Sequence, residues 1–149
     1  MTLFDELSTI VRALDQAGIE YALVGGLAVA VWGAPRATQD IDLLIRPESV
    51  DPVVSAMEPH GFRFRALPIT FKDGMTLQRI SKIEAGALLT LDLILVDLNL
   101  EPIWATRQRF DVDGTEVSVI SRAALIQMKA AAGRPQDALD IQNLEEADR

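Results

Sequence analysis

Residues 19–45 say most about the fold, and they read IEYALVGGLAVAVWGAPRATQDIDLLI. The first six residues, 19–24, are rich in apolar side chains and predict a short strand. Gly25-Gly26 ends this strand, because glycine adopts backbone conformations that other residues avoid. Residues 27–32 are apolar almost all round and predict a short buried helix. After a polar loop, residues 40–45 predict a second strand that begins with two aspartates.

The rest of the chain adds helices at both ends and strands between them. Residues 2–17 carry apolar side chains at helical spacing, and Thr2 with Asp5 approximates a capping box. Further helices are predicted at 50–57, 101–108, 122–132 and 135–147. Further strands are predicted at 62–65, 75–83, 87–96, 110–112 and 115–120, with hairpin turns at 84–86 and 113–114.

This order of elements predicts an α/β (α+β) fold, with a mixed β-sheet flanked by helices and further helices at the C-terminus. Strands and helices do not alternate regularly, so a doubly wound nucleotide-binding fold is less expected. No repeat or linker divides the chain, and we expect residues 1–149 to form a single domain.

The composition is acidic and free of cysteine. The formal net charge of -8 argues against a broad nucleic-acid surface, because phosphate neutralisation needs clustered lysine and arginine. No apolar run approaches the ~20 residues that span a bilayer. The first residues lack the basic and apolar segments of a signal peptide. We therefore expect a cytoplasmic protein with no membrane partner.

Three aspartates are the candidate catalytic and metal-binding residues. Asp40 and Asp42 lie two positions apart on one predicted strand, so their side chains share a face with Cα atoms about 6.6 Å apart. Two such carboxylates can converge on one divalent ion or bridge two, and without a cation or ordered water their proximity is costly. Asp92 stands in the middle of an almost wholly apolar strand. We take it as a third carboxylate that ligates metal or accepts the proton of an attacking hydroxyl.

Gly25-Gly26 is the candidate phosphate site. Backbone without Cβ atoms can approach a ligand closely, and the N–H groups that begin the next helix favour an anion such as a triphosphate. Neither a Walker A motif nor a dinucleotide fingerprint is present. The spacing between the glycine pair and the aspartate pair strengthens the interpretation.

These motifs resemble those of the DNA polymerase beta-like nucleotidyltransferase superfamily. The similarity rests on Leu23-Val24-Gly25-Gly26, the thirteen-residue spacer, Asp40-Ile41-Asp42 and the later Asp92. Within the superfamily, residues 24–28 together with the segment from Arg36 to Asp42 are most similar to minimal nucleotidyltransferases and to the AbiEii-type toxin family. Residues 125–129, 134–137 and 140–141 are similar to a second block of those families.

The resemblance implies a nucleotidyltransferase fold and transfer of a nucleoside monophosphate from an NTP to a hydroxyl. Asp40, Asp42 and Asp92 would hold Mg²⁺ or Mn²⁺. Gly25 and Gly26 would cradle the triphosphate, with Arg36 and Lys129 reaching the nucleotide. The implied acceptor is a protein, a tRNA or a small molecule, and a toxin–antitoxin or phage-defence role is included. A cognate toxin or antitoxin and a second copy of the chain stay open as partners.

Structural interpretations compete with several of these roles. Asp40 and Asp42 could face solvent at a sheet edge, Gly25-Gly26 could be an ordinary turn, and Asp92 could cap or pair with an arginine. Lys129 suits the end of a helix. Three basic side chains could contact a polyanionic acceptor, although a solvated strand face is the simpler interpretation: Lys72, Arg79 and Lys82.

Two other functions compete with the enzyme. A non-catalytic member of the superfamily would keep the fold as an antitoxin or a protein-interaction module, but retention of all three aspartates counts against it. A metal-dependent phosphohydrolase is disfavoured because no histidine or cysteine cluster accompanies the carboxylates.

Overall fold

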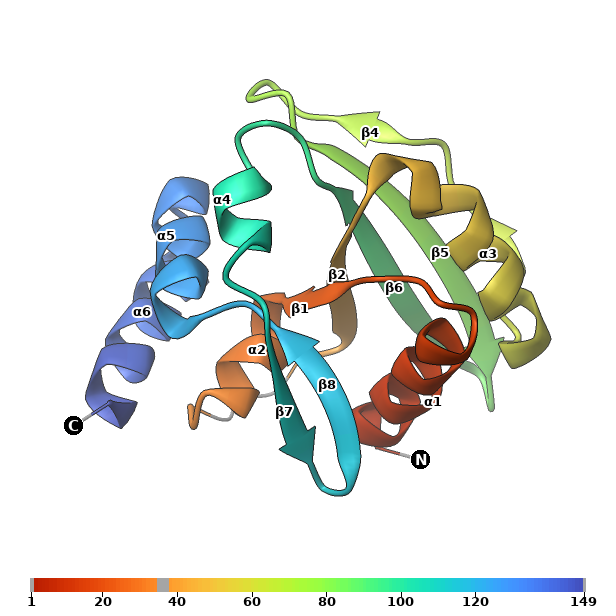
Figure 1. Ribbon diagram of the computed structural model, residues 1–149, viewed down its shortest axis with the longest axis horizontal. Helices are drawn as coiled ribbons and strands as arrows, with labels where there is room; N and C mark the ends of the chain where they lie inside the picture. Colours follow the sequence, from red (N-terminus) through yellow and green to blue (C-terminus); the bar gives the residue numbers. More distant parts are fainter. Residues whose placement is uncertain (1, 35–37, 149) are drawn as a thin grey trace.

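The computed structural model describes residues 2–34 and 38–148, and a mixed β-sheet runs through the middle of it (Figure 1). The strand order is β3-β5-β6-β2-β1-β8-β7, with β4 paired to the outer side of β5. Helices flank the sheet, which confirms the predicted α/β class.

The sheet is built from β1 (Ala22–Val24), β2 (Asp40–Ile45), β3 (Phe64–Arg65), β4 (Ile69–Thr70), β5 (Thr76–Glu84), β6 (Ala87–Leu95), β7 (Gln108–Val112) and β8 (Thr115–Val119). The helices are α1 (Leu3–Gln16), α2 (Gly25–Val31), α3 (Val50–Met57), α4 (Glu101–Trp104), α5 (Arg122–Ala132) and α6 (Pro135–Ala147), with short 3-10 turns η1 (Pro47–Ser49) and η2 (Glu58–His60). None of the helices in the described part of the chain combines the length and apolarity needed to cross a bilayer.

The central strand β2 carries Asp40 and Asp42. It runs antiparallel to β1 and parallel to β6, in a register that sets Asp42 beside Val24 on one side and beside Asp92 on the other. The long β5–β6 hairpin then sets Arg79 opposite Asp92. Three neighbouring strands therefore carry charged residues at the same level of the sheet.

The two faces of the sheet have different coverings. On β5, Lys82 contacts Glu6 of α1, so this face of the sheet is the one that α1 and α3 cover. Ile41 lies on the same face and is fully buried. Because strand side chains alternate, Asp42 projects from the opposite face. The charges of Lys129 on α5 and of Arg134, next to α6, act on Asp42, and these two helices lie side by side (left in Figure 1).

Local sequence explains the terminal helices well. Thr2 and Asp5 form the predicted capping box on α1, and the buried face of this helix is Leu7, Ile10, Val11 and Leu14. Pro135 occupies the first turn of α6, where its missing N–H is tolerated.

Several boundaries differ from the sequence-based prediction. The first strand is only Ala22–Val24, and α2 begins at Gly25 rather than at residue 27. The helix predicted at 101–108 ends at Trp104, because Gln108 pairs with Val119 across the β7–β8 hairpin. The strand predicted at 62–65 is confined to Phe64–Arg65, and the two-residue β4 was not predicted. Short edge strands depend on pairing with β5, which no local pattern specifies.

Candidate active site

Asp40, Asp42 and Asp92 lie on adjacent parallel strands of the sheet. Asp42 and Asp92 are direct register partners, and parallel strands lie about 4.8 Å apart. Asp40 is exposed at the start of β2, Asp42 is partly buried, and Asp92 is buried. The structure thus places the three predicted carboxylates on one sheet face, with Asp42 and Asp92 at the same level and Asp40 two residues earlier, beside Thr90.

Gly25 lies directly against the Asp42 carboxylate. Its φ of +72° is in the left-handed region that favours glycine. A Cβ atom at this position would stand 2.2 Å from Asp42 Oδ2 and 2.9 Å from Asp42 Cγ. The turn before α2 is therefore shaped around Asp42, a closer fit than an ordinary strand-to-helix turn requires. Gly26 is buried in the first turn of α2, and the preceding Val24 has no polar side chain to cap that helix.

Asp92 forms a two-pronged ion pair with Arg79. Arg79 Nε donates to Asp92 Oδ1 at 2.7 Å, and a terminal guanidinium nitrogen donates to Oδ2 at 2.9 Å. The structure thus shows the arginine pairing that competed with a metal role for Asp92. Sequence reasoning left Arg79 on a solvated strand face. Equal steps outward from the predicted turn at 84–86 would have placed Gln78 opposite Asp92. The structure instead pairs Glu84 with Ala87 around a two-residue turn, and this shift of one residue sets Arg79 opposite Asp92.

The acidic cluster shifts the ionisation of Asp42. Burial, together with the negative charges of Asp92 and Asp40, raises the pKa of Asp42 from 3.8 to about 7. The positive charges of Lys129 and Arg134 lower this pKa and only partly offset the increase. Asp42 is thus a carboxyl group at which added positive charge is favourable.

Carboxylate oxygens are the ligands that Mg²⁺ and Mn²⁺ prefer, and Asp40 and Asp42 fit that donor chemistry. Asp92 differs because both of its oxygens already bond Arg79. Across residues 2–34 and 38–148, no group of three or more histidine, aspartate or glutamate side chains is arranged to hold a metal ion. Asp40 and Asp42 are therefore the pair that could hold a cation, and the three-carboxylate set stays a prediction.

Lys129 lies in a buried ionic cluster that joins α5 to α6. Its Nζ is 2.9 Å from Asp140 Oδ2 and 3.3 Å from Asp137 Oδ1, and all three side chains are buried. Arg134 adds a second cation to Asp137 through a 2.7 Å contact. Lys129 is therefore an ion-pair partner of two acids, and its charge also reaches Asp42. The predicted contact between Lys129 and a nucleotide stays a prediction, and Arg36 lies outside the described residues.

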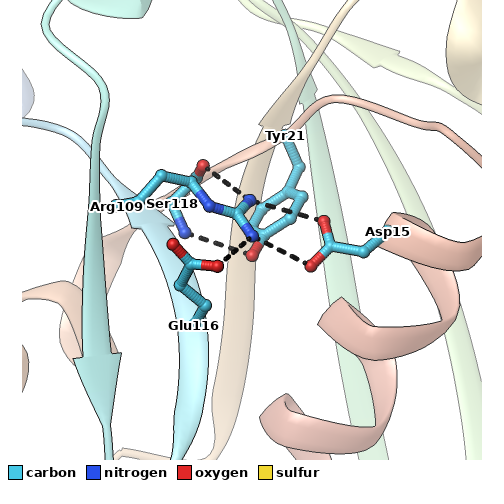
Figure 2. A network of polar contacts seen from close by, with 5 residues as sticks. All are labelled: Asp15, Tyr21, Arg109, Glu116 and Ser118. Carbon is cyan, nitrogen blue, oxygen red and sulfur yellow. Dashed lines mark hydrogen bonds and ion pairs between the residues drawn. The ribbon is translucent and has the colours of Figure 1, made fainter.

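A cleft of about 400 Å³ lies away from all of these residues, between the end of α1 and the β7–β8 hairpin. Figure 2 shows a polar network at this cleft: Arg109 contacts Asp15 and also Glu116, which lies outside the lining. The Tyr21 hydroxyl accepts from the Ser118 N–H at 3.1 Å. Burial raises the pKa of Tyr21 to about 12, which keeps the phenol neutral. This network ties α1 to the hairpin, and we assign it no chemistry.

The raised pKa of Asp42 makes a prediction about stability without metal. Unfolding at neutral pH releases a proton that the folded carboxyl retains, so this group lowers folding stability progressively from about pH 4 to about pH 7. We expect the free energy of unfolding of Asp42→Asn, relative to that of the wild type, to increase by about 2 kcal/mol from pH 5 to pH 8. Urea unfolding in EDTA at the two pH values measures this difference. An Asp42→Asn protein that gains nothing at pH 8 would contradict the assignment. Asp51→Asn is the control, because Asp51 is an exposed acid on α3.

Solved structures of other proteins share this fold. ANT(2")-Ia in complex with adenylyl-2"-tobramycin is 18% identical with a TM-score of 0.68, covering 99% of this chain and 94% of that one. An antigenic nucleotidyltransferase-like protein from Paracoccidioides brasiliensis is 22% identical with a TM-score of 0.60, covering 96% of this chain and 75% of that one. At these identities the similarities show the fold alone. No curated protein matches the sequence.

The family follows from the sequence match, which agrees with the superfamily indicated by the Gly-Gly and Asp-x-Asp motifs. Residues 1–133, most of the chain, match the model of a family described as an uncharacterised nucleotidyltransferase, and the protein belongs to that family.

Proposed function

We propose that this protein is a divalent-metal-dependent nucleotidyltransferase that transfers a nucleoside monophosphate from an NTP to a hydroxyl group. Asp40, Asp42 and Asp92 form the catalytic centre, and Mg²⁺ or Mn²⁺ is the cofactor. The observation that carries the proposal is the fit of the Gly25 turn around the Asp42 carboxylate, with Asp92 in register on the next strand.

The proposed reaction exchanges a phosphoanhydride bond of the NTP for a phosphate ester bond to the acceptor. The acceptor oxygen forms a bond to the α-phosphorus of the NTP, the bond from that phosphorus to the bridging oxygen breaks, and pyrophosphate leaves. Asp92 accepts the proton of the acceptor hydroxyl. A bound divalent ion would neutralise charge on the phosphate oxygens, which is the main requirement of this reaction class. Asp40 and Asp42 supply the carboxylates that hold it.

The nucleotide is proposed to lie over the Gly25-Gly26 turn. The absence of a Cβ at Gly25 admits the Asp42 carboxylate against the turn. The backbone N–H groups of the turn are proposed to bind the triphosphate beside it. Arg36 and Lys129 complete the proposed nucleotide contacts. ATP is a suitable donor, since the structurally similar ANT(2")-Ia carries an adenylyl group on tobramycin. That complex also favours a hydroxyl-bearing small molecule as acceptor over a protein or a tRNA.

The biological setting is a further part of the proposal. The resemblance of the segment from Arg36 to Asp42 to AbiEii-type toxins favours a toxin–antitoxin or phage-defence system with a cognate partner protein. The family match does not bear on this narrower similarity.

The second candidate function is a non-catalytic member that serves as an antitoxin or interaction module. The Arg79–Asp92 ion pair favours it, because an acid that bonds an arginine through both oxygens is less available to a metal or a proton. The two candidates differ in whether divalent ions and NTPs bind at the aspartates.

Calorimetric titration with each NTP, with and without Mg²⁺, tests the proposal. We expect metal-dependent binding by the wild type and its loss in the Asp40→Asn, Asp42→Asn double variant. Asp51→Asn is the matched control, because Asp51 is an exposed acid on α3, at the opposite face of the sheet. Absence of a metal-dependent response in the wild type, or an unchanged response in the double variant, would refute the active-site assignment. Incubation with NTP labelled at the α-phosphate then distinguishes transfer from hydrolysis by the product that carries the label.

A further inference from the structure

Arg79 bonds directly to Asp92, one of the three aspartates of the candidate site. It donates to both oxygens of Asp92, and the charges of Asp40 and Asp42 also stabilise its guanidinium group. The two partners differ in exposure, because the Arg79 side chain is 50% exposed whereas that of Asp92 is 7% exposed. The arginine therefore reaches from solvent onto a buried carboxylate.

The geometry of this pair constrains Asp92. Two parallel N–H···O bonds from a planar guanidinium fix the plane of a carboxylate as well as its position. An ionised carboxylate offers about four lone-pair sites, so two remain after the bonds to Arg79. Asp92 can thus keep Arg79 and still present oxygen toward the neighbouring Asp42.

The positive charge of Arg79 is equally important. Asp42 and Asp92 are side by side on parallel strands, so their carboxylates project from the same sheet face, where positive charge nearby reduces their mutual repulsion. Arg79 supplies that charge within the chain. A cation that binds at Asp40 and Asp42 then approaches a site that already holds one positive group.

We propose that Arg79 is a positioning residue of the active site, which fixes the Asp92 carboxylate beside Asp42 and acts as the resident counter-ion that a divalent cation must share. The inference rests on the proposed function, because it assigns Arg79 to the same metal-binding centre. Arg79 acts through Asp92 and through its charge, and it makes no contact with the reacting atoms.

Two substitutions separate the charge from the geometry. Arg79→Gln removes the positive charge. We expect Mn²⁺ to bind about tenfold more tightly to this variant, because the ion no longer meets repulsion from a guanidinium group at a separation of roughly 7 Å in a high-dielectric environment. Arg79→Lys keeps the charge without the planar fork, so Mn²⁺ affinity is expected to stay near that of the wild type. Electron paramagnetic resonance of free Mn²⁺ measures both affinities without an acceptor or turnover.

Thermal unfolding in EDTA provides the second measurement. Arg79→Gln leaves Asp92 without its partner, and we expect the melting temperature to fall by about 5 °C. For Arg79→Lys we expect a smaller fall in the melting temperature. Adding Arg79→Gln to Asp92→Asn is expected to lower the melting temperature no further than Asp92→Asn alone. Arg65→Gln is the control, because Arg65 makes a single exposed contact with Asp51.

The outcomes distinguish this inference from the proposed function. A wild type that binds no Mn²⁺ overturns the metal-dependent function, and the counter-ion role with it. A wild type that binds Mn²⁺ with the same affinity as Arg79→Gln overturns only the counter-ion role. Equal melting temperatures of Arg79→Gln and wild type in EDTA overturn the positioning of Asp92.

Discussion

Gly25→Ala is expected to weaken the proposed metal-dependent NTP binding by about 100-fold or more, because misplacement of a site group by about 1 Å has effects of this size. The new Cβ would fall 2.2 Å from Asp42 Oδ2, so either the Asp42 side chain or the α2 backbone must move. The left-handed φ of +72° adds strain of about 1–2 kcal/mol for alanine. Calorimetry with Mg²⁺ and ATP measures the binding, and urea unfolding measures the stability.

Gly18→Ala is the matched control for this variant. Gly18 has a nearly identical φ of +70°, but an added Cβ there meets nothing within 4 Å. Both variants should therefore lose similar stability from backbone strain, and only Gly25→Ala should lose binding. Equal binding by the two alanine variants would show that the Gly25 turn does not shape the site.

Lys129→Met is expected to reduce folding stability by about 3–5 kcal/mol, because it removes one partner of a buried ionic cluster. Methionine occupies a comparable volume but leaves Asp137 and Asp140 without their shared cation. The loss of positive charge should also raise the pKa of Asp42 further, since Lys129 lowers it in the wild type. Urea unfolding at pH 7 measures the stability.

Arg134→Met provides the comparison for Lys129→Met. It also removes a cation from Asp137, but the Arg134 side chain is 70% exposed, and exposed pairs contribute about 0–1 kcal/mol. We therefore expect a much smaller loss than for Lys129→Met. Similar losses in the two variants would mean that burial of the cluster does not determine its contribution.

The sequence was most informative where the signal was local. The bounds of β2, α3, α5 and α6 agree with prediction, because caps, prolines and apolar periodicity lie within each segment. The hairpin turns at 84–86 and 113–114 were also predicted, and Ala85, Gly86, Asp113 and Gly114 all adopt the positive φ that such turns need. The short edge strand β4 escaped prediction because it is defined by its pairing with β5.

In the candidate site, too, local sequence predicted some features and tertiary contacts decided the others. The predicted strand pattern placed Asp40 and Asp42 on one face, and the apolar run around Asp92 indicated a buried acid. The partners of the charges could not be inferred from local pattern. Arg79 on Asp92 and the two acids on Lys129 come together through strand register and helix packing, over sequence separations that periodicity does not cover.

The amino-acid sequence by itself determined the order of the helices and of every strand except β4, the mixed α/β class and the Gly25-Gly26 and Asp40–Asp42 motifs, because each depends on residues that are close along the chain. The tertiary structure alone decided that Gly25 touches the Asp42 carboxylate and that Asp92 bonds an arginine. It also decided that Lys129 lies buried between Asp137 and Asp140. The physical reason is that the ionisation and ligands of a carboxylate depend on neighbours in space, and the pairing of β2 with β6 and of α5 with α6 selects those neighbours.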